Sequence, residues 1–550
     1  MGQKKTNSTS TGFVVQGSIL AVASILARVI GLIYRVPVTR VIGDYGNGLY
    51  GFAFEVYSMM LLISSYSLPT AISKLVAARN HNREHKNAYK IFKAGMFLAV
   101  AVGTFTAVVT FFLADFIAGT IMKDPMIAFS LRVLAPAILI VAIMGILRGY
   151  YQGLGTMMPT AISQIVEQLV NAIVSVVASM YLFSYGSKVA KILQNDKYGP
   201  AYGAAGSTLG TLAGAIVGLA FLLFMMAIYQ RVLKKKLARD RTVRTESYRE
   251  IYKLLFATIV PIILSTAVYN SSVFIDQIIF NNVMSAKGVA DYTTMFGVFT
   301  GKYRLLVNVP VSIASAMAAS TIPSLTAAVA SKDRALINGK INISIRFVMV
   351  IAIPSSVGLA VLGSPILQLL FKDTRALPAR LLLVGSSAVV FYSLSTLSNG
   401  ILQGLNKMKV PVTNAFISLV LHVILVYVLV SFTELNIYSM VIGSVFFALL
   451  MCILNSIAIR RATGYRQEIH KTFVIPIIAS AAMGLASYLV YYGMDKLTHS
   501  NTISIIIALI VAVVVYGVLL LVLKGFTEEE LFSLPKGYLI VGLAQKLHLI

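Results

Sequence analysis

The chain has 550 residues, of which 58% are hydrophobic and only 12% are charged, whereas soluble domains average roughly 45–50% and 25%. This composition excludes a water-soluble fold. The net charge of +26 does not indicate nucleic-acid binding, because the basic residues fall in short segments between apolar runs and form no recognition motif. The single cysteine, Cys452, excludes an intrachain disulfide.

Apolar runs long enough to cross roughly 30 Å of hydrocarbon, about 20 residues each, recur along the whole chain. They predict an all-α integral membrane protein of about fourteen transmembrane helices. We interpret the segment after the opening MGQKKTNSTSTGF as a retained helix and not as a cleaved leader. The predicted helices span 13–38, 48–78, 90–118, 127–150, 159–184, 203–230, 252–281, 289–329, 341–365, 378–404, 411–432, 436–461, 472–494 and 501–524.

Four segments between these helices are rich in Lys and Arg: 79–93, 231–253, 332–346 and 460–471. Such segments face the cytoplasm in multi-pass proteins. We therefore place all four on the cytoplasmic side, and an even number of helices puts both termini there too. For the 231–253 segment, contact with anionic lipid headgroups is the default interpretation, and a cytoplasmic partner is the alternative.

Two short motifs occur twice. Residues 149–154 read GYYQGL and residues 400–405 read GILQGL, each followed by Met and Pro. A weaker pair aligns SLPTAISKLVAA at 67–78 with TIPSLTAAVA at 321–330. Two matches at nearly the same offset indicate a duplication. Six predicted helices separate the copies, so the halves share one orientation, and transporters of that design bind substrate between the halves near the midplane.

The duplication predicts two parallel six-helix lobes and two further helices. The N-lobe covers 1–230 and the C-lobe covers 252–461, and a basic cytoplasmic linker at 231–251 joins them. The last part, 472–550, holds the two additional helices and a cytoplasmic tail. A G-x-x-x-x-G-K-[ST] loop is missing from the sequence, so ATP does not drive this chain directly. The predicted class is a secondary transporter and not an enzyme.

Three arginines lie within the predicted helices. Arg28 and Arg35 of the first helix are seven residues apart, so they share one face about 10 Å apart. Arg304 lies near the middle of the eighth helix. A charge at the bilayer centre costs at least about 2.5 kcal/mol, so it should face a cavity or a partner. Because the planar fork of Arg suits phosphate and carboxylate, we expect the three to bind an anionic substrate.

The alternative is that each arginine only pairs with an intramembrane acid, Glu55, Glu167 or Asp276, and that Arg35 reaches the outer interface. The three acids are also candidates for coupling transport to Na⁺ or H⁺. For Glu167 and its neighbours Gln168 and Asn171, hydrogen bonding between helices is the favoured structural interpretation.

The remaining polar and glycine patterns have simpler interpretations. Gln152 and Gln403 lie in the repeated motif near cytoplasmic helix ends, where gating and helix capping are both open. The glycines of GDYGNGLYG at 43–51 suggest a flexible external turn. No motif for a metal or a cofactor is present, and we expect neither. Packing between helices is the expected role of four glycines at intervals of four: Gly206, Gly210, Gly214 and Gly218.

Three segments, LARVIGLIYRVPVTRVIG, GLYGFAFEVY and SLPTAISKLVA, carry a family resemblance. With them the chain resembles the multidrug/oligosaccharidyl-lipid/polysaccharide (MOP) exporter superfamily. It is most similar to the polysaccharide biosynthesis branch, with the MurJ-type lipid II flippases and the stage V sporulation protein B relatives. By this resemblance, Arg28 matches the Arg of an R-x-x-G pattern and Arg304 that of a helix-eight pattern. Two departures are Tyr34 beside Arg35, and Leu61 in place of a helix-two Arg.

The resemblance implies a flippase in a bacterial plasma membrane. Its cationic cavity would hold the diphosphate of an undecaprenyl-linked saccharide precursor, with lipid II of peptidoglycan synthesis as the leading candidate. Alternating access would carry this lipid from the inner to the outer leaflet, next to the cell-wall synthesis machinery. Two alternatives stay open: a cation-coupled multidrug exporter of the same superfamily, and a non-transporting membrane scaffold for cell-wall or spore envelope synthesis.

Overall fold

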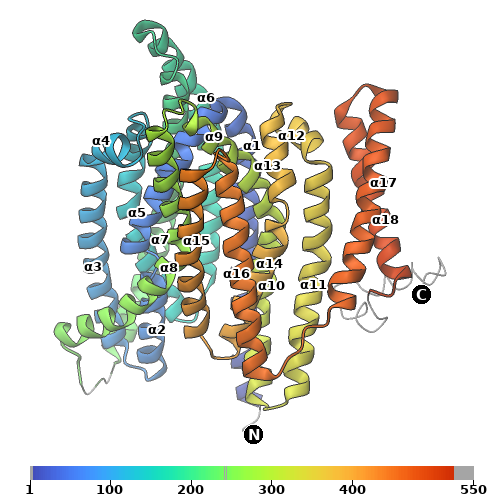
Figure 1. The fold of residues 1–550 in the computed structure, drawn as a ribbon. Coiled ribbons are helices and arrows are strands. Elements are labelled where there is room, and N and C mark those ends of the chain that lie inside the picture. Colours follow the sequence, from blue (N-terminus) through green and yellow to red (C-terminus); the bar gives the residue numbers. More distant parts are fainter. Residues whose placement is uncertain (1–3, 241, 243, 526–550) are drawn as a thin grey trace. The chain divides into compact units, whose positions relative to one another are not determined.

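A computed structural model describes residues 4–240, 242 and 244–525. Every regular element in these ranges is a helix, which confirms the all-α prediction (Figure 1). The elements, with η for π-helical turns, are α1 (Lys4–Ser64), α2 (Leu68–His81), α3 (His85–Phe112), α4 (Ala114–Phe116), η1 (Ile117–Ile121), α5 (Ile127–Gly153), α6 (Met158–Leu193), α7 (Tyr198–Ala238), α8 (Tyr248–Ala286), α9 (Tyr292–Val298), η2 (Phe299–Tyr303), α10 (Arg304–Ala330), α11 (Arg334–Val361), α12 (Gly363–Phe371), α13 (Ala376–Gly385), α14 (Ala388–Gly404), α15 (Lys409–Phe432), α16 (Tyr438–Thr463), η3 (His470–Val474), α17 (Ile475–Thr498) and α18 (Asn501–Val522).

The chain forms two compact units, unit 1 (Met1–Gly301) and unit 2 (Lys302–Ile550). Unit 1 holds α1 to α9, and unit 2 holds α10 to α18. The predicted lobe boundaries at the 231–251 linker derive from the sequence repeat and stay a prediction. The predicted cytoplasmic tail, from residue 526 on, lies outside the described residues.

Twelve helices in the described ranges are long and apolar enough to cross a membrane, and a pair bent by 45°, α13 with α14, raises the number to thirteen. One of the twelve, Val22–His81, covers 60 residues, although about 20 suffice for one crossing. Gly43 interrupts it with φ 69° and ψ −176°, a conformation that glycine adopts without a steric penalty. We therefore count this element as two crossings, in agreement with the prediction of about fourteen.

The glycine-rich segment 43–51 is not the flexible external turn that the sequence suggested. The helix resumes directly after the break at Gly43, and Gly48 and Gly51 face α9. A Cβ at Gly48 would lie 2.1 Å from the Thr293 carbonyl oxygen, and one at Gly297 would lie 1.7 Å from that of Asp44. The missing side chains permit contact between two helix backbones here, and that contact fixes the segment.

The two copies of the repeated motif pack in the same way within their own units. In unit 1 the motif ends α5, and a Cβ at Gly149 would lie 2.6 Å from the carbonyl oxygen of Pro69 in α2. In unit 2 the motif ends α14, and a Cβ at Gly400 would lie 3.2 Å from that of Ala318 in α10. In each unit, the helix it approaches also carries the second repeated segment. This correspondence supports the duplication.

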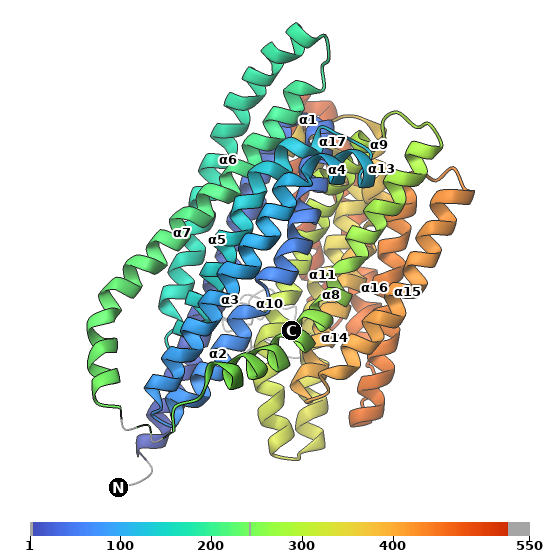
Figure 2. The ribbon, with the colours of Figure 1, turned by 90° about the vertical axis from the view of Figure 1, so that its left-hand side faces the viewer.

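The glycines of α7 pack against α6, which runs beside it (Figure 2). A Cβ at Gly206 would lie 2.5 Å from the Ala178 carbonyl oxygen, and one at Gly210 would lie 2.6 Å from the Ser175 nitrogen. Both neighbours are backbone atoms of α6, which a side chain cannot displace cheaply. The packing role predicted for these glycines is therefore confirmed.

Replacing Gly210 by Ala should destabilise the protein by about 1–3 kcal/mol, the usual cost of overpacking. Gly493→Ala in α17 is the matched control, because nothing lies within 4 Å of its added Cβ. In a helix that control should be neutral or stabilising by up to about 1 kcal/mol. Thermal unfolding of the two purified variants measures the difference. Equal midpoints for both would show that α6 and α7 are not packed this closely.

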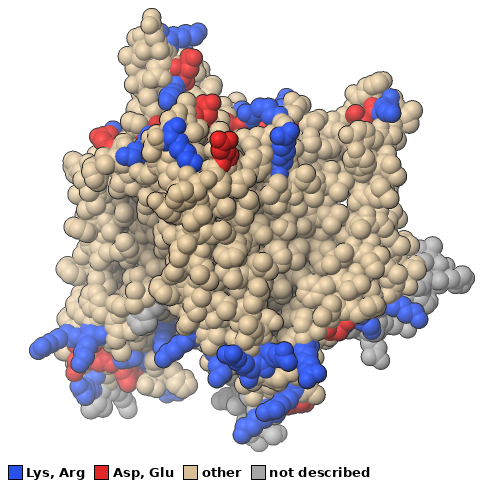
Figure 3. Space-filling model, viewed as in Figure 1, with Lys and Arg blue, Asp and Glu red and all other residues tan. Residues whose placement is uncertain are grey.

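Charged side chains gather near the helix ends of each unit, and the visible surface between them is free of charge (Figure 3). In unit 1 the first two basic segments meet, with Arg79 Nη2 2.7 Å from Glu246 Oε1. In unit 2 the last two meet, where the Tyr465 hydroxyl donates to Asn342 Oδ1 at 3.2 Å. This agrees with a shared side for each pair. That this side is cytoplasmic stays a prediction.

Candidate functional site

One face of α1 borders α6 in unit 1. Four residues of α1 lie within an arc of about 60° of the helix: Ser24, Arg28, Gly31 and Arg35. The Ser24 hydroxyl donates to Gln164 Oε1 of α6 at 3.2 Å, and a Cβ at Gly31 would lie 3.9 Å from Gln168 Oε1. The two arginines therefore lie beside a polar stretch of α6. We refer to these four residues as the arginine face.

Arg28 and Arg35 differ in their surroundings. Arg28 is exposed, and in the described part of the chain it makes no hydrogen bond or ion pair. It lies 15 residues before the break at Gly43, about 22 Å along the helix. Arg35 is half-buried, and its guanidinium lies 4.3 Å from the ring centroid of Tyr50, a cation–π contact worth about 0.5–2 kcal/mol. Arg35 is thus held in place, whereas Arg28 carries an unneutralised charge.

Glu167, one of the three acids considered as partners for Arg28, pairs with another arginine. Arg148 Nη2 of α5 lies 2.7 Å from Glu167 Oε2, and both side chains are largely buried, at 15% and 22% exposure. Arg148 Nε also donates to Ser163 Oγ at 3.0 Å. Arg148 was not predicted as a site residue, although a lone charge in an apolar run directly before the repeated motif is a visible signal.

The polar stretch continues one turn further along α6. Asn171 Nδ2 donates to the Tyr34 hydroxyl of α1 at 3.3 Å, and Asn171 Oδ1 accepts from Ser175 Oγ at 2.9 Å. This agrees with the predicted hydrogen bonding between helices. Gln168 Oε1 is buried and has no hydrogen-bond partner among the described residues. The amide oxygen of Gln168 can therefore still accept a hydrogen bond at the arginine face.

Arg304 belongs to unit 2, where it is half-buried at the first residue of α10. The π-helical turn η2 precedes it, and the buried Tyr303 hydroxyl donates to the Gly385 carbonyl oxygen at 3.1 Å. Arg304 lies 12 residues after Tyr292, the first residue of α9, which is about 18 Å along a helix. Because Arg304 and the arginine face are in different units, their meeting around one substrate stays a prediction.

The other two candidate acids lie in unit 1. Glu55 is half-buried in α1, and Asp276 is buried in α8. Beside Asp276, Gln277 is fully buried, and both polar atoms of its amide are without a hydrogen-bond partner among the described residues. Roles for the two acids in ion coupling stay predictions. Within the described ranges, no group of three or more His, Cys, Asp or Glu is placed to hold a metal ion.

Gln152 and Gln403 occupy the last turns of α5 and α14. The carbonyl oxygen of Gln152 accepts from the Gly155 nitrogen, and that of Gln403 accepts from the Asn406 nitrogen, both at 3.0 Å. Gly155 and Asn406 have positive φ, 86° and 59°, as is common just after a helix end. The repeated motif therefore ends a helix in both units, and a gating role for the two glutamines stays untested.

A second charged group, also missed from the sequence, lies in unit 2. Lys302 Nζ lies 2.5 Å from Asp373 Oδ2, and each side chain is only 6% exposed. Arg375 Nη2 lies 2.7 Å from the same carboxylate oxygen. Burial raises the pKa of Asp373, but hydrogen bonds from Arg375 and Lys302 outweigh it and hold the pKa well below its usual range. The carboxylate is thus a fixed anion between two cations.

A family profile described as "Polysaccharide biosynthesis protein" matches residues 14–329, more than half of the chain. The chain belongs to the polysaccharide biosynthesis protein family. A second profile, MatE, matches residues 261–428. Among curated relatives of this family member, "Lipid II flippase MurJ" of Bacillus subtilis is 26% identical over 86% of the chain and 87% of the relative. "Stage V sporulation protein B" of the same organism is 23% identical over 94% and 96%.

Solved structures share the fold of this polysaccharide biosynthesis family member. "Lipid II flippase MurJ, inward closed conformation" has a TM-score of 0.65 and 15% identity, over 91% of this chain and 97% of that one. An inward-facing multidrug resistance MATE family transporter of the MOP superfamily has a TM-score of 0.57 and 16% identity, over 81% and 99%. These likenesses show the fold. The two family profiles, together with the curated relatives, assign the chain to the MOP superfamily of multi-pass transporters, as predicted, and not to an enzyme family.

Proposed function

We propose that this transporter flips an anionic undecaprenyl-diphosphate-linked saccharide precursor from the inner to the outer leaflet of a bacterial plasma membrane. Lipid II is the leading candidate. In this proposal Arg28, Arg35 and Arg304 bind the diphosphate, and the transporter alternates access from one side to the other. The similarity to a lipid II flippase over most of both chains supports the substrate class.

The observation that carries the proposal is the unpaired charge of Arg28. Its candidate partner Glu167 is neutralised by Arg148, and Arg28 makes no ion pair in the described ranges. A guanidinium inside a membrane-spanning helix is too costly to leave facing lipid. A diphosphate would accept two parallel hydrogen bonds from it and neutralise its charge. The same arginine would repel an organic cation.

A second candidate function is a cation-coupled multidrug exporter, which the MatE match over residues 261–428 favours. It requires acids to dominate the binding site. The arginine face in unit 1 is positively charged instead. The multidrug exporter is therefore the second candidate, after the flippase.

Reconstitution into liposomes tests the proposal. Fluorescent lipid II, other undecaprenyl-diphosphate sugars and a fluorescent organic cation would be placed in separate liposomes with the purified protein. Access of a membrane-impermeant quencher to each probe then reports transbilayer movement. Movement of one or more diphosphate-linked lipids is the expected result. Movement of the organic cation alone would favour the exporter, and movement of no probe would favour a scaffold.

A further inference from the structure

The basic segment after α7 is docked against the α2–α3 turn and the adjoining first turn of α3 in unit 1. Both ends of this segment are helical, because α7 continues to Ala238 and α8 begins at Tyr248. In between, the Lys86 nitrogen donates to Asp240 Oδ2 at 2.5 Å. The Glu246 nitrogen donates to Asn87 Oδ1 at 3.0 Å, in addition to the ion pair of Glu246 described above. The described residues of this segment, 239, 240, 242 and 244–247, are therefore part of the packed structure of unit 1.

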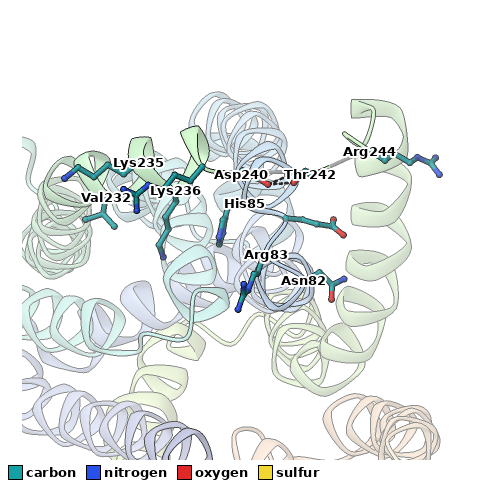
Figure 4. A pocket seen from close by; sticks show the side chains of 11 residues that line it. Asn82, Arg83, His85, Val232, Lys235, Lys236, Asp240, Thr242 and Arg244 are labelled. Carbon is teal, nitrogen blue, oxygen red and sulfur yellow. Dashed lines mark hydrogen bonds between the residues drawn. The ribbon is translucent and has the colours of Figure 1, made fainter. Parts of the chain in front are cut away.

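A hollow of about 860 Å³ lies between the end of α7 and this turn (Figure 4). Five Lys or Arg residues and two carboxylates line it, so the lining carries a formal charge of +3 with His85 neutral. Figure 4 shows Lys236 of α7 and Arg83 of the turn extending to the same side of the hollow. The basic residues of the lining are Arg83, His85, Lys235, Lys236, Arg239 and Arg244.

The two acids of the lining are already engaged. Glu84 Oε2 accepts from Asn87 Nδ2 at 3.0 Å. Asp240 Oδ1 accepts from the Thr242 nitrogen and hydroxyl, at 2.8 and 2.6 Å, in addition to the bond from the turn. Of these hydrogen bonds, the one from the Lys86 nitrogen to Asp240 joins the docked segment to α3. The carboxylates are thus less available to neutralise the cations around the hollow.

The cations around the hollow differ in whether their side chains have a partner in the described part of the chain. Arg244 pairs with Glu250 at 2.9 Å, and Lys236 lies 3.4 Å from the Tyr229 hydroxyl. In contrast, the side chains of Arg83, Lys235 and Arg239 make no hydrogen bond or ion pair with the described part of the chain. Like charges held close together repel one another, and a bound anion would remove this cost.

We propose that this hollow binds a phosphate group, with Arg83, Lys235 and Arg239 as its ligands. Arg supplies a planar fork for phosphate oxygens, and Lys supplies a point charge. The phosphate belongs either to an anionic phospholipid of the adjacent membrane surface or to a soluble anion. Because its ligands come from α7, the docked segment and the α2–α3 turn, the bound phosphate ties these three parts together.

The test compares two double variants of the full-length protein that each lose two positive charges from this part of α7 and the docked segment. Lys235→Ala with Arg239→Ala removes ligands of the hollow, whereas Arg231→Ala with Lys234→Ala removes exposed cations that do not line it. In detergent, pyrophosphate at constant ionic strength should raise the thermal unfolding midpoint of the wild type and the control. The hollow variant should need at least about 100-fold more pyrophosphate, because it loses two ligands and each charge-assisted hydrogen bond is worth about one decade or more.

A second arm identifies the source of the phosphate. The proteins are passed over a sizing column with mixed phosphatidylcholine and phosphatidylglycerol, and the retained lipid is measured by mass spectrometry. Selective loss of phosphatidylglycerol from the hollow variant alone supports a lipid headgroup, and a difference with pyrophosphate alone supports a soluble anion. If the two double variants behave alike in both arms, the proposal is wrong. Midpoints without ligand verify that both variants are folded.

Discussion

Arg28→Ala should slow flipping of a diphosphate-linked lipid by about 10- to 100-fold in proteoliposomes. This factor corresponds to the loss of one charge-assisted hydrogen bond, worth about 1.5–3 kcal/mol. Arg28 has no ion pair to lose among the described residues, so its removal should leave folding intact. Arg28→Lys keeps the charge but loses the planar fork, and we expect an intermediate rate. Arg304→Ala should act in the same direction if both arginines bind the diphosphate.

Arg231→Ala is the matched control for this experiment. It also removes one exposed arginine, from α7, and should transport at the wild-type rate. Equal amounts of inserted, folded protein are verified by size-exclusion chromatography before each assay. Wild-type transport by Arg28→Ala and Arg304→Ala would remove both residues from the mechanism and leave the family assignment untouched.

Asp373→Ala should destabilise the protein by about 3–5 kcal/mol, because it breaks a buried ion pair by removing the carboxylate beside Lys302. The matched control is Asp115→Ala. Asp115 pairs with Arg132, but these side chains are 69% and 41% exposed, so the control should cost about 1 kcal/mol or less. Thermal unfolding in detergent compares the two. Similar losses for both would contradict the inferred burial of the Lys302–Asp373 pair.

The lowered pKa of Asp373 determines how the stability difference between the wild type and Asp373→Ala depends on pH. A carboxylate with a depressed folded pKa contributes its stability above its unfolded pKa, near 3.9. That contribution is lost only as the pH falls through the lower folded pKa. The gap between the wild type and Asp373→Ala should therefore stay constant from about pH 8 to pH 5. A gap that already closes in this window would show that Asp373 is not held as a fixed anion.

Much of the fold was predictable because a bilayer imposes a minimum length on each apolar run. The sequence repeat indicated the equivalent packing of α5 on α2 and of α14 on α10. Lys and Arg density indicated that the basic segments share one side, but the pairs that meet within each unit are visible only in the structure. The break at Gly43 falls in the predicted gap between 13–38 and 48–78. That the helix resumes directly after it was not predictable, because the packing of Gly48 on α9 is not encoded by a local pattern.

The candidate site was predictable in part, because a charge within an apolar run is visible in the sequence, as for Arg28, Arg35 and Arg304. Its partners were not predictable. Glu167 is 19 residues from Arg148, and Asp373 is 71 residues from Lys302, and no local pattern encodes such pairs. The docking of the basic segment depends on the Lys86 nitrogen donating to Asp240 and the Glu246 nitrogen donating to Asn87. These partners are more than 150 residues apart, and no local pattern encodes them.

The central claim is that the transporter recognises a diphosphate. The most direct test compares the transbilayer rates of two fluorescent lipids with the same sugar and polyprenyl tail, one joined by a diphosphate and one by a monophosphate. The account predicts that the diphosphate lipid moves at least about tenfold faster, and that Arg28→Ala reduces this preference. Equal rates for the two lipids in the wild-type protein would contradict it.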